Sequence, residues 1–241
     1  MLFGKSRYAS YTDQKKKRHY FRWFALGLFI FYVAYIALTG LFFSTKVLEN
    51  NAMYPELRAG DRFVVSSYAV RSLLPDAWVN HSLPFKRGSV VLVDTTLDVS
   101  YSLFEKVLEG LIRFFTAQRI GFLRKEPPYI KRVIGLPGDE ITMTNYVLRI
   151  RPRGETYTFT EFELSDKTYD VTIPQVPALW DGAIPFSGNR ETQVLGEGEC
   201  FVLSDDRSNT NDSRTWGAVP VDRVIGKALF RYWPLTRFGS P

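Results

Sequence analysis

The stretch YIKRVIGLPGD, residues 129–139, joins an apolar strand to a tight turn. Ile130 and Val133 are β-branched residues of the kind that favours strands, and Leu-Pro-Gly-Asp at 136–139 is typical of a turn. Lys131 lies within this apolar strand. A lysine at such a position is usually a surface residue whose charged end reaches water. If Lys131 is instead buried, desolvation disfavours its ammonium form, and the neutral amine is a competent general base.

Short β-branched segments bounded by turn residues continue on both sides of this strand, and they predict a mainly β, antiparallel, barrel-like or sandwich-like fold. The predicted strands are residues 60–68, 88–94, 129–134, 140–150, 155–163, 199–204 and 224–232. Two insertions interrupt this pattern. Residues 97–125 have helical apolar spacing and are expected to pack on the β domain or to lie on a membrane surface. Residues 150–195 indicate an insertion or small subdomain.

Residues 23–45, WFALGLFIFYVAYIALTGLFFST, contain no charged side chain. At about 1.5 Å per residue, this run is long enough to cross about 30 Å of hydrocarbon. Basic residues precede it, so we expect residues 1–22 to be a cytoplasmic tail, 23–45 a transmembrane helix, and 46–241 an extracytoplasmic domain at the cytoplasmic (inner) membrane. A cleaved signal peptide is disfavoured by the length of the run and by the lack of a following Ala-x-Ala-like site. A buried soluble helix is disfavoured because the run is apolar on all sides and has a basic flank.

The chain has 31 basic and 25 acidic residues, a formal net charge of +6. Seven of the basic residues and one acid precede residue 23, so the remainder has no net charge and offers no basic field to a phosphate backbone. We therefore expect no nucleic-acid partner. The single cysteine, Cys200, can form neither an intrachain disulfide nor a cysteine-rich metal site, and we expect no metal and no cofactor.

Three segments resemble, in order and spacing, the sequence boxes of type I signal peptidases. The lysine box is YIKRVIGLPGD, the box that follows the membrane anchor is NAMYPELRAGD at 51–61, and the last box is FVLSDDRSNTNDSRTWGAVP at 201–220. The resemblance implies a serine endopeptidase that removes signal peptides from exported pre-proteins without a metal or cofactor. In that family a lysine deprotonates a serine, which attacks the carbonyl at an Ala-x-Ala-like site. The implied partners are the lipid bilayer and signal peptides bound as an added, extended strand.

The resemblance also implies roles for individual residues. The implied catalytic positions are Ala52 at the place of the nucleophile, Lys131 as general base, Thr210 as the hydroxyl that orients the lysine, and Asn50 as an oxyanion donor. The implied substrate-binding residues are Met53 and Ile130, and the implied structural supports are Asp205, Arg207, Asp212 and Arg214.

Residue 52 departs from the family, which has a serine there. A methyl group cannot attack a carbonyl, so we predict that the chain is catalytically inactive. Asn50, Ser204 and Asp206 also depart from the family pattern, which favours natural loss of the nucleophile over a single laboratory substitution. Natural loss would leave a pseudoprotease that binds exported segments without cutting them. A membrane-tethered structural β protein with no peptide partner is a third alternative.

Overall fold

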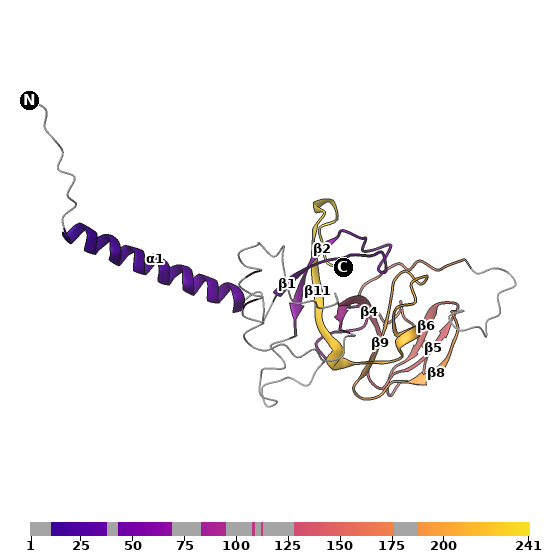
Figure 1. Cartoon of the computed structure of the whole chain (residues 1–241). Coiled ribbons are helices and arrows are strands. Elements are labelled where there is room, and N and C mark those ends of the chain that lie inside the picture. Colours follow the sequence, from indigo (N-terminus) through magenta and orange to yellow (C-terminus); the bar gives the residue numbers. More distant parts are fainter. Residues whose placement is uncertain are drawn as a thin grey trace, which may run out of the picture.

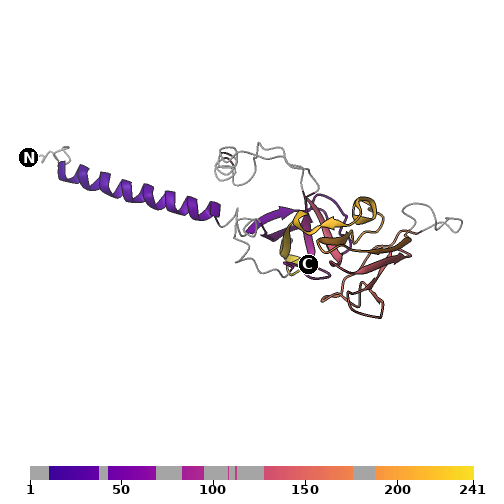
Figure 2. The same ribbon diagram turned by 90° about the horizontal axis from the view of Figure 1, so that it is seen from below.

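The computed structural model describes residues 11–37, 43–68, 83–94, 108, 112, 128–175 and 188–241. Within them, a long helix, α1 (Tyr11–Ala37), extends away from two β-sheets, and the views in Figures 1 and 2 agree on this separation. No helix in the described part of the chain is long and apolar enough to cross a membrane.

The helix differs from the predicted segment 23–45 at both ends. It begins at Tyr11, within the basic tail, and residues 43–45 belong to strand β1 (Phe43–Val47) instead of a helix. All five residues of β1 pair with β2, so residues 43–45 join the sheet although they belong to the charge-free run. The predicted helical insertion 97–125 lies outside the described residues, apart from Leu108 and Ile112, which are helical.

Antiparallel pairing joins all the neighbouring strands of both sheets, as predicted. The large sheet has the order β1-β2-β11-β3-β4-β9-β10. Its further strands are β2 (Arg62–Ser67), β11 (Val224–Trp233), β3 (Val90–Val93), β4 (Tyr129–Gly135), β9 (Glu199–Leu203) and β10 (Val219–Pro220). The small sheet has the order β7-β6-β5-β8, with β7 (Phe159–Thr160), β6 (Val147–Arg151), β5 (Glu140–Thr144) and β8 (Arg190–Val194). The short helices are α3 (Ser213–Trp216), η4 (Val221–Arg223) and η5 (Leu235–Arg237).

Five predicted strands agree with the structure to within two residues at each end. They are 60–68, 88–94, 129–134, 199–204 and 224–232. The predicted strand 140–150 is instead a hairpin, because Asn145 and Tyr146 adopt positive φ angles of 51° and 66° between β5 and β6. Positive φ at both central residues is the geometry of a two-residue hairpin turn. Only β7 forms within 155–163, and β8 lies in the predicted insertion 150–195.

The centre of the large sheet is covered on both faces. Strand β3 is buried at every position, with Val90 and Leu92 in one apolar cluster and Val91 and Val93 in another. The next strand, β4, is buried from its second residue onward. A charged residue on β4 therefore lies inside the protein, and this position determines the chemistry of the site.

Candidate functional site

Lys131 lies on β4, opposite Val91 of β3, and is 1% exposed. Of the two environments considered for this lysine, a surface position and a buried one, the structure shows the buried one. Its Nζ donates a hydrogen bond of 2.8 Å to Ser204 Oγ. Nζ also lies 5.9 Å from the centre of the Tyr129 ring and 5.8 Å from that of Trp216.

The environment lowers the pKa of Lys131 from 10.5 to about 8. Burial is the main cause, because it disfavours the ammonium form. The charges of Asp212 and Asp205 act in the opposite direction, and that of Arg214 adds to the lowering. The amine can therefore lose its proton near neutral pH, as a general base must.

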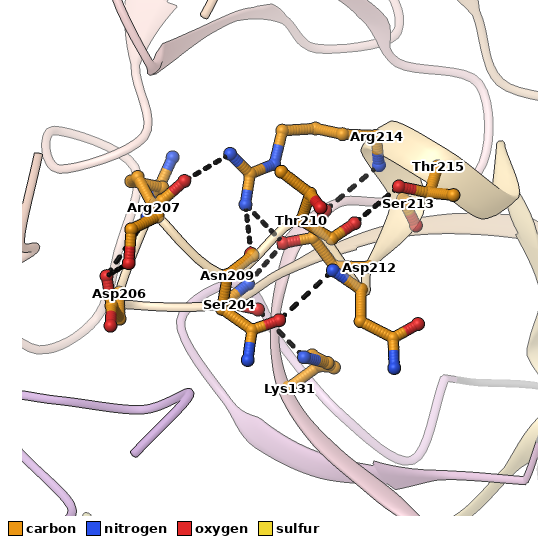
Figure 3. A network of polar contacts seen from close by, with 12 residues as sticks. Lys131, Ser204, Asp206, Arg207, Asn209, Thr210, Asp212, Ser213, Arg214 and Thr215 are labelled. Carbon is orange, nitrogen blue, oxygen red and sulfur yellow. Dashed lines mark hydrogen bonds and ion pairs between the residues drawn. The ribbon is translucent and has the colours of Figure 1, made fainter. Parts of the chain in front are cut away.

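Ser204 connects Lys131 to a buried ion pair (Figure 3). The Ser204 N–H donates to Asp212 Oδ2 at 2.9 Å, and Arg214 binds the same carboxylate through Nε at 2.9 Å and Nη2 at 2.8 Å. Burial alone would raise the pKa of Asp212, but the hydrogen bonds and charge of Arg214 hold it below the usual value. Asp212 therefore remains an anion that fixes the backbone of Ser204.

Ala52 attaches to the same loop. Its carbonyl accepts a hydrogen bond of 3.0 Å from the N–H of Asp206, two residues after Ser204. Met53 and Ile130 belong to one apolar cluster, which packs the segment after Ala52 beside β4. The structure thus brings all three boxes together: the one at 51–61, the lysine box and the one at 201–220.

Asn50 and Thr210 lie in the two loops that carry Ala52 and Ser204. The side-chain oxygen of Asn50 accepts the N–H of Ala52 at 3.0 Å, which leaves the NH₂ group of this amide as the donor for a peptide oxygen. The carbonyl of Thr210 accepts the N–H of Asp212 at 2.8 Å. The predicted roles of both side chains toward a substrate and toward Lys131 stay predictions.

The partner that the sequence did not indicate for Lys131 is Ser204. The sequence marked Ser204 only as a departure from the family pattern. The contact follows from the register between β4 and β9. Arg132 pairs with Leu203, and because the strands are antiparallel, Lys131 lies opposite Ser204.

Two buried arginine pairs support the loops around the site. Arg132 binds Asp205 through Nε and Nη2, at 2.8 and 2.6 Å, and also contacts Glu56 at 2.6 Å. Arg207 binds Glu161 at 2.6 Å, and neither side chain is exposed. These contacts support the structural roles expected of Asp205 and Arg207. They add Arg132, Glu56 and Glu161, which sequence reasoning missed because their partners lie far away in the chain.

Metal ligands do not cluster in the described part of the chain. No group of three or more His, Cys, Asp or Glu residues there is arranged to hold an ion.

The sequence of this chain is similar to those of a known protein family. The sequence model described as "Signal peptidase, peptidase S26" matches residues 20–233. The chain belongs to the type I signal peptidase family. Signal peptidase IB of Staphylococcus aureus, in strains Mu50 and N315, is 32% identical over 116 residues, which cover 47% of this chain and 58% of those proteins. Signal peptidase I of Bacillus caldolyticus is 28% identical over 236 residues, which cover 94% of this chain and 97% of that protein.

Proposed function

We propose that this chain binds the signal peptides of exported pre-proteins and does not cleave them by the serine–lysine mechanism of its family. Membership of the signal peptidase family supports the ligand class, since its relatives bear the name of that activity. The absence of cleavage is proposed because residue 52 has only a methyl side chain. The loop of Ser204 and Asp206 hydrogen-bonds both to Ala52 and to Lys131, a buried lysine that readily loses its proton.

The family reaction begins when a serine hydroxyl gives its proton to the lysine and attacks a peptide carbonyl. Ala52 has neither the proton nor the lone pair that this step needs. Ser204 does have a hydroxyl within 2.8 Å of Lys131 Nζ. However, Ser204 is fully buried and its N–H is bound to Asp212, so it is suited to positioning the lysine and not to meeting a peptide.

We further propose that the charge-free stretch beginning at Trp23 anchors the chain in the cytoplasmic membrane, with the N-terminus in the cytoplasm and the β domain outside it. The basic residues before Trp23 support this orientation. Large apolar side chains of α1 are exposed, including Trp23 at 62%, Phe24 at 70% and Phe29 at 62%, and exposed apolar surface of this kind needs lipid or a partner. Alkaline extraction of membranes tests the anchor, and release of the chain into the soluble fraction would contradict it.

The test of the function uses the full chain in detergent with a pre-protein that carries an Ala-x-Ala site. We expect no cleavage by the unaltered chain. We expect some cleavage by Ala52→Ser, and none by Ala52→Ser combined with Lys131→Met. Cleavage by the unaltered chain that persists in Lys131→Ala would refute the assignment of the lysine. Cleavage by the unaltered chain that persists in Lys131→Ala and is lost in Ser204→Ala would instead point to Ser204 as the nucleophile.

A further inference from the structure

Lys131 is a buried group for which the missing nucleophile leaves no catalytic use. Within the described residues its Nζ has one hydrogen-bond acceptor, the neutral hydroxyl of Ser204. An ammonium group carries three N–H donors, and buried charges in proteins are normally paired with an opposite charge. The protonated form of Lys131 therefore has capacity for an anionic partner.

The neighbouring carboxylates do not fill this role. Asp212 is bound by Arg214, and Asp205 is bound by Arg132 through both of its oxygens. Among the described residues, the rings of Tyr129 and Trp216 also face Nζ, and their faces attract a cation but do not neutralise it. Among the described residues, the site thus holds a buried cation whose neighbouring carboxylates are both engaged by arginines.

We propose that Lys131 binds the free C-terminal carboxylate of a peptide that ends in a small residue. The inference rests on the proposed function and names its ligand more closely: a cleaved signal peptide, or another peptide ending in Ala-x-Ala, instead of an intact pre-protein. The carboxylate would take the place that the scissile carbonyl occupies in an active relative. One of its oxygens would accept from Nζ, in a charge-assisted hydrogen bond.

The residues around Ala52 suit a small terminal side chain. The buried Ala52 carries only a methyl group, and Met53 and Ile130 belong to one buried apolar cluster. No charged side chain occurs at residues 50–54, so the lysine supplies the charge that selects for a carboxylate on this side of the site.

The experiment compares three short fluorescent peptides of the same sequence with the full chain in detergent. One ends in Ala-x-Ala with a free carboxylate, the second is the same peptide amidated, and the third continues past the cleavage position. At about pH 6.5, where Lys131 is protonated, we expect the acid to bind at least about tenfold more tightly than the amide, because charge-assisted hydrogen bonds are the stronger ones. A bound carboxylate favours the ammonium, so we expect the preference to persist through pH 8 and to fall at about pH 10.

Variants separate the charge of Lys131 from other effects. Lys131→Met should abolish the preference for the acid, and circular dichroism checks that this variant is folded. Lys86→Met is the matched control, since Lys86 is an exposed lysine paired with Asp166, and the preference should survive there.

Two failures are distinguishable. Equal binding of acid, amide and extended peptide, or an acid preference that survives Lys131→Met, overturns the carboxylate proposal but leaves peptide capture standing. If none of the three binds better than a control peptide with lysine in place of both alanines, the proposed function fails, and the carboxylate proposal fails with it.

Discussion

Replacement of Lys131 by methionine should stabilise the protein at neutral pH. The buried ammonium is disfavoured relative to the unfolded chain, where the same group is in water. Methionine has a similar length and no charge, so the variant keeps most of the packing and loses the cost of burying a cation. The sign of this effect is opposite to that of most core substitutions, which destabilise.

The magnitude follows from the pKa of Lys131. Its folded value is about 8 and its unfolded value 10.5, and each unit of difference corresponds to about 1.4 kcal/mol, so the cost below pH 8 is about 3 kcal/mol. Between these two values the unfolded chain holds a proton that the folded chain has released. Stability therefore rises with pH across this window, and the cost is fully relieved above the unfolded pKa.

The assay is urea unfolding of the full chain in detergent, followed by near-ultraviolet circular dichroism from about pH 7 to about pH 10.5. We expect the advantage of Lys131→Met to shrink by about 3 kcal/mol across this range, whatever constant amount the methionine packing adds. Lys86→Met, an exposed control, should show no comparable trend. A difference between wild type and Lys131→Met that stays constant with pH would mean that folding leaves the pKa of the lysine unchanged, and the argument for a general base would fall with it.

Two further substitutions test the contacts around the lysine. Ser204→Ala removes the acceptor that stabilises the ammonium, so the pKa of Lys131 should fall below about 8 in an NMR titration of its side-chain carbons; an unchanged pKa would contradict the hydrogen bond. Glu161→Gln leaves the buried guanidinium of Arg207 without its carboxylate and should lower the free energy of unfolding by about 3–5 kcal/mol. The matched change at the exposed Glu155 should have little effect, and equal losses in the two variants would refute a special role for the Glu161 pair.

The sequence predicted the parts of the fold that depend on local pattern. Strands such as β3 and β4 are short, β-branched and bounded by turns, and they agree closely with the predicted 88–94 and 129–134. The hairpin within 140–150 was missed because positive φ at a tyrosine is unusual; the turn is held by the pairing of β5 with β6 and by hydrogen bonds from Asn145 and Tyr146 to Asn189 and Gly188. Strand β1 was missed because its first three residues are the end of the charge-free run 23–45, which was predicted to be helical.

The part of the candidate site that lies in the three family boxes was predictable from the sequence. Ala52, Lys131 and Asp212 were identified from sequence, and the structure attaches all three to one loop system. Ser204 as the partner of Lys131 was not identified, because the contact depends on the register between β4 and β9. Glu161 was not identified because its partner Arg207 lies 46 residues away in the chain.

The ion pairs that hold the loops of the site do not depend on the side chain at the nucleophile position. The ion pairs Arg132–Asp205, Arg207–Glu161 and Arg214–Asp212 hold the loops without any contribution from the side chain of residue 52. Loss of a serine hydroxyl there can therefore leave the lysine in place. Stability alone would favour an apolar residue at position 131, because the buried ammonium costs about 3 kcal/mol at neutral pH. A lysine that carries this cost in a chain whose residue 52 cannot react has a use under the proposal made above, in which its ammonium group binds a peptide carboxylate.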